Sequence, residues 1–163
     1  MQPKRSIHNV KKCELARALL CTALTLCATF APGIAGAALG EPETSVRSDL
    51  EQLHGSAKIA ERANFRMHEM QLPSGTLVRE FAADGRVFAV TWTGPTIPNL
   101  RQILGRYFDN YVAAAGANRL GHHHLQIHQD DFVVQSGGHM RAFSGLAYLP
   151  PALPGGLKLE DLH

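Results

Sequence analysis

The sequence predicts an α+β domain: an antiparallel sheet of about six strands, one long amphipathic helix packed on a face, and a short N-terminal helix. Three observations lead to this prediction. The segment 99–115 repeats apolar residues with the period of a helix. Short β-rich segments separated by turn residues precede and follow it. The length, 163 residues, leaves room for one domain once a targeting segment is set aside.

The first 37 residues have the pattern of a secretory signal peptide. Basic residues come first, an apolar run follows, and Ala35-Gly36-Ala37 supplies the small residues that a signal peptidase reads. An uncleaved anchor helix is the alternative. A proline and a glycine at positions 32 and 33, just before the small-residue site, favour cleavage. We therefore expect an exported protein, periplasmic or secreted, with no membrane span after cleavage.

Cleavage after Ala37 would leave a single α+β domain over 38–154 and a C-terminal tail over 155–163. All three cysteines lie in the removed segment, so this domain would have no disulfide, thiolate metal site or cysteine nucleophile. The mature chain, residues 38–163, would carry 11 basic and 13 acidic residues. Because a nucleic-acid footprint requires a basic face, no nucleic-acid partner is expected.

The first half of the domain is predicted to contain a short helix and a three-strand meander. After an irregular lead-in over 38–43, apolar residues at helical spacing predict a helix from Thr44 or Ser45 to about Ala57. Strands are expected over 65–72, 76–82 and 86–93, with turns at Pro73-Ser74-Gly75 and Asp84-Gly85. The third strand is apolar on both faces, which is typical of a central strand, with Phe88, Val90 and Trp92 sharing one face.

The second half is predicted to contain the long helix and further hairpins. Pro98 suits the first turn of the helix and Gly116 its end. Strands are expected over 125–128 and 132–136. Gly137-Gly138 would form a two-residue hairpin loop, and a strand over 139–149 would return from it, with Gly145 marking a bulge or bend.

Most of the domain resembles a known protein family. The segments that carry the resemblance are AALG at the expected mature start, HEMQLPSGTLVREF, GRVFAVTWTGPTIPNLRQILGRYF and VVQSGGHMRAFSGLAYLPPALP. On these segments the chain resembles the bacterial secreted family catalogued as domain-of-unknown-function family 2844. The resemblance implies a small exported protein of Gram-negative envelopes and implies no reaction. The histidine-rich segment 121–128 departs from the family pattern.

A serine hydrolase would use Ser136 as nucleophile, His139 as base and Asp130 as the residue that orients the histidine, with Ser144 and Asp131 as substitutes. The predicted Gly-Gly loop would make Ser136 and His139 cross-strand neighbours. However, the segment has no nucleophile elbow, and a hairpin tip excludes water poorly. A serine and a histidine that merely close a turn are the simpler interpretation.

Other candidate residues also have a simpler reading. On an extended strand His122, His124 and His128 share a face, but His122 and His128 would stand about 20 Å apart, too far for one zinc or copper ion. Arg141, beside His139, would suit an anion or a partner carboxylate, although an outward-facing strand arginine is more usual. The aromatic residues, spaced at helical and strand periods, are interpreted as core.

Three functional hypotheses follow. The first is a non-enzymatic binding or accessory domain whose partner is another envelope protein or a small ligand, with no cofactor. The second is an envelope hydrolase that uses the Ser136/His139 hairpin. The third is a periplasmic zinc or copper binder that uses the histidines of 122–128.

Overall fold

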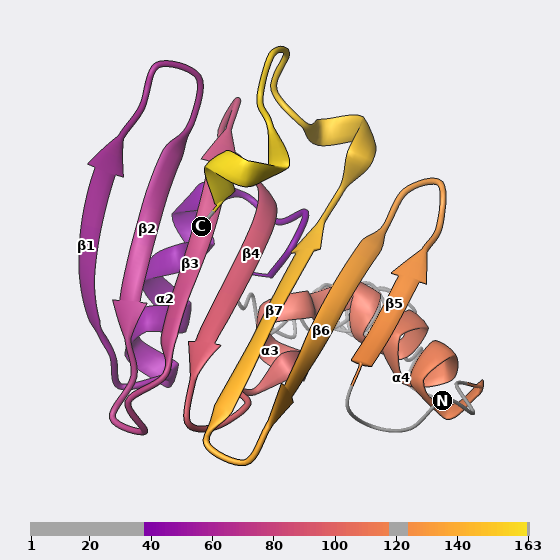
Figure 1. Ribbon diagram of the computed structural model, residues 1–163. Coiled ribbons are helices and arrows are strands. Elements are labelled where there is room, and N and C mark those ends of the chain that lie inside the picture. Colours follow the sequence, from indigo (N-terminus) through magenta and orange to yellow (C-terminus); the bar gives the residue numbers. More distant parts are fainter. Residues whose placement is uncertain (1–37, 118–123, 163) are drawn as a thin grey trace, which may run out of the picture. The chain divides into compact units, whose positions relative to one another are not determined.

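The computed structural model describes residues 38–117 and 124–162, which belong to one compact unit (Figure 1). Its centre is a seven-stranded antiparallel sheet in the order β1-β2-β3-β4-β7-β6-β5. Two meanders, β1 to β4 and β5 to β7, are joined because β7 pairs with β4. The strands are β1 (Ser56–Glu61), β2 (Arg66–Gln71), β3 (Leu77–Ala83), β4 (Arg86–Gly94), β5 (His124–His128), β6 (Val133–His139) and β7 (Ala142–Tyr148).

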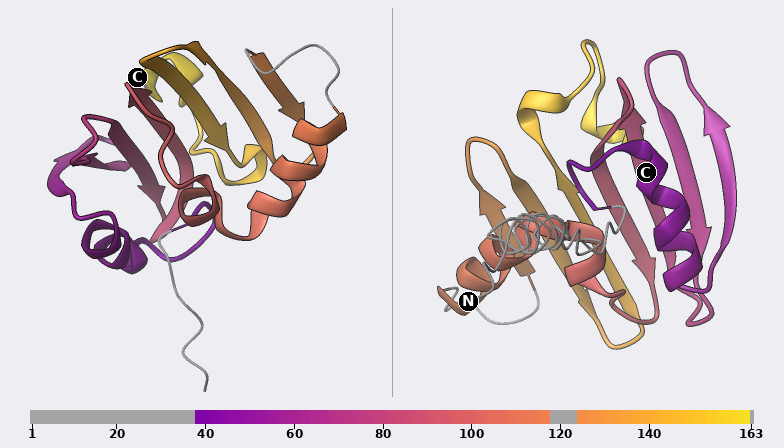
Figure 2. Two further views of the ribbon diagram at one scale, coloured as in Figure 1. Left: turned by 90° about the horizontal axis from the view of Figure 1, so that it is seen from below. Right: turned by 180° about the vertical axis from the view of Figure 1, so that it is seen from behind.

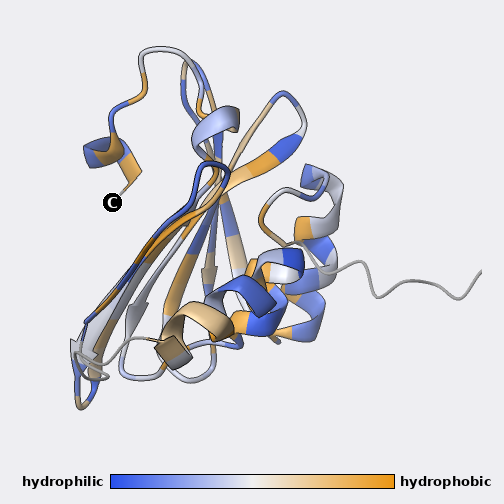
Figure 3. Ribbon diagram, turned by 90° about the vertical axis from the view of Figure 1, so that its right-hand side faces the viewer, coloured by the Kyte–Doolittle hydropathy of each residue, from blue (hydrophilic) through white to orange (hydrophobic). Residues whose placement is uncertain are grey.

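The main helices cover one face of the sheet, which we call the helix face (Figure 2). They are α2 (Val46–Gln52), α3 (Leu100–Leu104) and α4 (Phe108–Ala117), with a 3-10 turn, η2 (Gly105–Tyr107), between the last two. The opposite face, which we call the open face, carries the C-terminal segment (Figure 3). That segment contains the 3-10 turns η3 (Pro150–Ala152) and η4 (Leu159–Leu162), and a further turn, η1 (Glu43–Ser45), precedes α2.

The predicted fold, six strands with one long helix on a face, is wrong. The sheet has seven strands, and the segment expected to be one helix is divided into α3, η2 and α4. The division occurs at Gly105, whose φ of +51° lies outside the right-handed helical region. A Cβ atom on this glycine would lie 2.2 Å from the Cβ of Ala38. The helix is therefore interrupted where the segment 38–43 crosses it.

The segment 38–43, expected to be an irregular lead-in, connects the helices to the sheet. On one side the Leu39 amide donates to the Ile103 carbonyl at 3.1 Å, and Arg106 Nη2 donates to Glu41 Oε1 at 2.6 Å. On the other side the Gly40 amide donates to the Val87 carbonyl at 2.8 Å. Leu39 is fully buried. We call this segment the connecting segment.

The additional strand, β1, comes from residues partly assigned to the first helix. That helix was expected to continue to about Ala57 but ends at Gln52, and His54 follows with a φ of +51°. Strand β1 pairs with β2 over its whole length and lies at the sheet edge. Its residues are almost all exposed, so its sequence lacks the apolar alternation by which a strand is recognised.

The predicted Gly137-Gly138 hairpin loop is also wrong. Both glycines lie within β6, and the turn is formed by Met140 and Arg141, so that His139 pairs with Ala142. A loop at the glycines would instead pair Arg141 with Val134, which is fully buried on the helix face. The observed register avoids this cost, because burying an unpaired guanidinium is unfavourable.

The three strands of the first meander lie within two residues of the predicted ranges, and β4 is central as expected. The prediction that Phe88, Val90 and Trp92 share one face of β4 is correct only in part. Phe81 pairs with Ala89 whereas Ala82 pairs with Val87, so Phe88 is an extra residue in a bulge. The bulge moves Phe88 to the open face, where it packs with Phe81, while Trp92 remains on the helix face.

A hydrophobic cluster lies on each face of the sheet. The helix-face cluster is the larger and includes Leu39, Trp92 and Ile103. The open-face cluster includes Phe81 and Leu162, and Leu162 is fully buried although it lies in the segment expected to be a tail. Within the described ranges, no helix is both apolar enough and long enough to cross a membrane.

The contact between Gly105 and Ala38 generates a stability prediction. We expect Gly105→Ala to lower the free energy of unfolding by at least about 2 kcal/mol, because the new methyl group is strained at positive φ and collides with Ala38. Urea unfolding followed by tryptophan fluorescence measures this. The matched control is Gly116→Ala, since a Cβ there has open space within α4 and should raise stability slightly. Equal stability of Gly105→Ala and the parent protein would contradict the assigned break.

Candidate ligand-binding pocket

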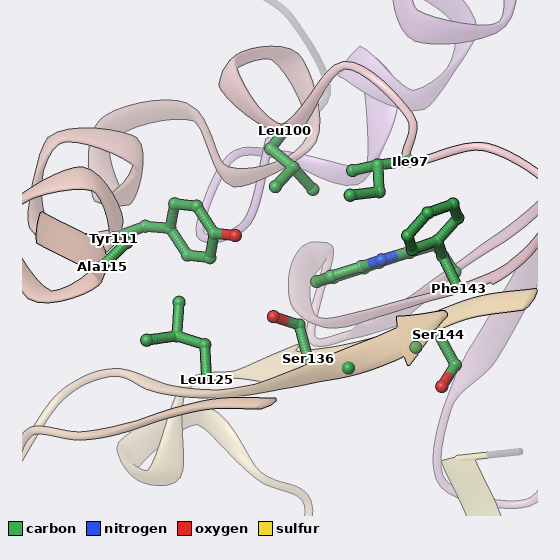
Figure 4. Close-up of a pocket in the computed structure, with 11 residues that line it drawn as sticks. Ile97, Leu100, Tyr111, Ala115, Leu125, Ser136, Phe143 and Ser144 are labelled. Atoms are coloured by element: carbon green, nitrogen blue, oxygen red, sulfur yellow. The ribbon is translucent and has the colours of Figure 1, made fainter. Parts of the chain in front are cut away.

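A pocket lies between the helices and the helix face, near the β6–β7 turn (Figure 4). Its volume is about 110 Å³. It exists because α4 packs loosely: none of the residues of this helix is buried, although one side of it is rich in apolar side chains. The residues that line it are Trp92, Ile97, Leu100, Tyr111, Ala115, Leu125, Ser136, Gly137, Gly138, Phe143 and Ser144.

Glycine in β7 makes room for the tryptophan that forms part of the pocket wall. Trp92 on β4 is directly opposite Gly145 on β7. A Cβ atom on Gly145 would lie 2.0 Å from the indole ring, so only glycine fits there. Gly145 therefore marks a close contact with a ring and not the bulge expected from the sequence, because the pairing of β7 with β4 is continuous.

Two hydroxyl groups project into this otherwise apolar space. Figure 4 shows the Tyr111 hydroxyl directed inward from α4 and the Ser136 hydroxyl directed inward from β6. Leu100, Ile97 and Leu125 contribute apolar surface around them. Neither hydroxyl has a hydrogen-bond partner among residues 38–117 and 124–162. The pocket can therefore accept a small apolar group that carries a hydrogen-bonding atom.

The pocket adjoins the end of the sheet at which Met140 and Arg141 form a turn. Ile97, on its wall, is 52% exposed. A shallow cleft next to the pocket shares Phe143 and Ser144 with it and is also lined by Pro95 and Arg141. A ligand in the pocket would thus extend toward Arg141 when it leaves the cover of the helices.

The residues expected to form a hydrolase site do not come together. Ser136 lies on the helix face, whereas His139, three residues later in the same strand, points to the open face. Asp130 lies in the loop before β6, so the whole length of that strand, about 20 Å, separates it from His139. Ser144 shares the open face with His139, but no hydrogen bond joins their side chains within the described residues.

The histidines are only partly described. His124 and His128 lie at the two ends of β5 on the open face, about 13 Å apart, and His122 lies outside the described residues. The described residues contain no group of three or more side chains that could hold a metal ion. Zinc or copper binding through His122 remains a prediction. Arg141, expected in a strand, lies instead in the β6–β7 turn with a φ of +67°.

A pair of buried carboxyl groups lies elsewhere on the helix face. The carboxyl group of Glu80 on β3 lies near that of Asp49 on α2, and both residues are buried. Burial raises the pKa of Glu80 well above its ordinary value, and the adjacent Asp49 carboxyl raises it further. Gln102 of α3 donates to Asp49 Oδ1 at 3.0 Å. The raised pKa favours the protonated form of Glu80, and the bond from Gln102 to Asp49 links α3 to α2 beside β3.

A second charged cluster fixes the start of α2 at the edge of the sheet. Glu43 Oε1 accepts from Arg66 Nη1 at 2.6 Å and lies 2.7 Å from His68 Nε2. Burial opposes ionisation of Glu43, but the hydrogen bonds and charges of Arg66 and His68 outweigh it and lower its pKa. Glu69, by contrast, pairs with Arg79 on the open face at 2.9 Å, as expected for cross-strand neighbours.

The geometry of the pocket involves residues that sequence reasoning assigned to the core. Trp92, Tyr111 and Phe143 occur at regular strand and helix spacings, so the sequence does not distinguish a filled interface from one that contains a space. The available signal was the cluster of glycines at 137, 138 and 145, which removes side chains from one region of the sheet.

Comparison with protein families gives one match. A family described as a protein of unknown function, DUF2844, matches residues 35–162. The chain belongs to this family. The match spans every described element of this DUF2844 protein, from the connecting segment to η4. Searches of the curated proteins and of the solved structures give no match.

The buried carboxyl pair predicts an unusual dependence of stability on pH. A carboxyl group whose pKa is raised by folding makes the folded state less stable as the pH rises above the pKa that the group has in the unfolded chain, near 4.5. Above that pH only the unfolded state loses the proton. We expect the free energy of unfolding to fall as the pH rises above about 5, with a slope approaching about 1.4 kcal/mol per pH unit. Glu43 has a lowered pKa, so its contribution is lost only on acidification below that range.

Glu80→Gln should flatten this profile, because glutamine has no proton to lose. Urea unfolding of the parent protein and the variant at several pH values measures the difference. Glu69→Gln is the matched control, since that carboxylate lies on the open face in an ion pair and should leave the profile unchanged. Parallel profiles for the parent and Glu80→Gln would show that Glu80 does not hold the proton.

Proposed function

We propose that this protein is an exported, non-enzymatic binding domain that takes an apolar group about the size of a ring into the pocket beneath α4. The observation that carries the proposal is the pocket itself: apolar walls, two inward hydroxyl groups without partners, and a glycine-lined strand pair beneath them. The DUF2844 family supplies no activity, so the proposal rests on this geometry.

The size of the pocket limits what enters it. A cavity of about 150 Å³ in another protein accommodates benzene, whereas pockets for drug-sized molecules occupy about 300–1,000 Å³. The volume here, about 110 Å³, therefore suits one small ring or a short branched chain. The hydroxyl groups of Tyr111 and Ser136 would fix the orientation of a polar atom on that group. The rest of the ligand would lie outside, beside Ile97.

The arrangement supports binding more than hydrolysis. The one serine hydroxyl that points into the pocket, that of Ser136, has no histidine or carboxylate among the other lining residues. Activation of a serine requires a base within hydrogen-bond reach. A bound group would therefore meet hydrogen-bonding hydroxyls without an adjacent base.

The N-terminal pattern supports export. The basic and apolar stretches of 1–37 precede the first described residue, Ala38, and the connecting segment follows at once. We infer that the segment is removed and that the domain acts in the periplasm or outside the cell. Its ligand or partner would then be a component of the envelope or of the medium.

Binding can be measured through the only tryptophan of the chain, Trp92, which lies on the pocket wall. The probe is 3-phenylpropan-1-ol, added to protein purified after export, with the N-terminus identified by mass spectrometry. We expect a saturable change in tryptophan fluorescence with a Kd of roughly 0.1–1 mM, which for a ten-atom ligand corresponds to about 0.4–0.6 kcal/mol per non-hydrogen atom.

Two variants test whether the pocket is the site. Ala115→Phe fills the pocket from α4 and should weaken binding at least about tenfold. Ala113→Phe, on the same helix but exposed, is the matched control and should bind like the parent protein. Ser136→Val fills the pocket from β6 and is a second test of the site in case Ala115→Phe does not fold. Equal binding by all of these proteins, or no saturable binding at all, would refute the proposed function.

A further inference from the structure

We infer that the ligand is an anion: a small molecule whose apolar group occupies the pocket and whose carboxylate contacts Arg141. This inference rests on the proposed function and specifies the chemistry of its ligand. It depends on three features of the turn that closes β6 and β7. These are a cation without a carboxylate partner among the described residues, the absence of acidic residues from the described connections around it, and a backbone conformation that is unfavourable for arginine.

The guanidinium of Arg141 has no carboxylate partner in the described part of the chain. Within residues 38–117 and 124–162, the strand register places four connections at this end of the sheet: 53–55, 72–76, 95–99 and 140–141. None of them contains an aspartate or a glutamate. A carboxylate near Arg141 would therefore meet a positive charge without an adjacent negative one.

The backbone at Arg141 adopts a conformation that is unfavourable for an arginine. Its φ of +67° is a conformation that glycine adopts readily and that costs an arginine about 1 kcal/mol. In the described part of the chain, the other non-glycine residues at positive φ are His54, which follows α2, and Asp84, whose residue type is common in such turns. Strain of this kind is concentrated at binding sites, where the side chain compensates for it.

The distance between Arg141 and the pocket suits a single small molecule. Arg141 precedes Phe143 by two residues, a separation of about 7 Å along the strand. Phe143 lines both the pocket and the shallow cleft that contains Arg141. A ring in the pocket with a carboxylate on a spacer of a few atoms would reach the guanidinium. The planar fork of arginine donates two parallel hydrogen bonds to a carboxylate.

The experiment compares a carboxylate with its neutral analogue. Tryptophan fluorescence titrations use benzoate, phenylacetate, 3-phenylpropionate and 3-phenylpropan-1-ol, with N-acetylphenylalanine as a mimic of a peptide carboxyl terminus. We expect one of the carboxylates to bind about tenfold more tightly than the neutral alcohol, because a charge-assisted pair adds to the same apolar contact. Its affinity should fall as salt is added, whereas that of the alcohol should not.

Arg141→Gln should remove the preference for the carboxylate and leave alcohol binding unchanged. Arg141→Lys should keep part of the preference, because it retains the charge without the planar fork. Arg86→Gln, an exposed cation at the opposite end of β4, is the matched control. Tightest binding by N-acetylphenylalanine would assign the carboxylate to a peptide terminus, and tightest binding by an arylalkanoate would assign it to a free small acid.

The outcomes separate this inference from the proposed function. If the alcohol and every carboxylate bind equally well, and Arg141→Gln changes nothing, the inference of an anionic ligand is wrong while the pocket remains a binding site. If Ala115→Phe leaves binding of every probe unchanged, the pocket itself is not the site, and both proposals fail.

Discussion

The contact between Ala38 and Gly105 determines how the helices lie on the sheet. The connecting segment 38–43 bonds to β4 on one side and to α3 on the other. Its first described residue occupies the space that a side chain at position 105 would need, so the helical segment cannot continue straight. Helix α3 consequently packs tightly, with Ile103 and Leu104 buried, while α4 starts anew in a different direction.

The pocket follows from this change of direction. The apolar residues of α4 are only partly buried, so the amphipathic face of the helix is not fully used in packing. Beneath it, glycines at 137, 138 and 145 withdraw side chains from the sheet, and Trp92 lies against the last of them. A helix held away from a sheet that is rich in glycine leaves room for one small group. The buried Asp49 and Glu80 carboxyls do not contribute to this space, but the bond from Gln102 to Asp49 links α3 to α2 beside β3.

The sequence predicts the local elements better than their arrangement. The meander of β2, β3 and β4 and the Asp84-Gly85 turn were predictable, because alternation and turn residues are local signals. The break at Gly105 was not, because it results from a contact with a residue 67 positions earlier. The register of the β6–β7 hairpin places Arg141 in the turn and not opposite the buried Val134, which local turn preference at Gly137-Gly138 does not encode. Among the candidate site residues, Ser136 and Arg141 lie at or beside the pocket, whereas His139 and Asp130 do not.

The central claim is that the space beneath α4 is the binding site and that the ligand extends from it to Arg141. Nuclear magnetic resonance of the ¹⁵N-labelled protein, titrated with 3-phenylpropionate, tests it most directly, since the single indole N–H signal belongs to Trp92. The account predicts that this signal and the amides of Ser136, Arg141 and Phe143 shift together with one affinity. Shifts confined to the open face, around Arg79 and Gln135, or to the neighbourhood of Glu80, would contradict it.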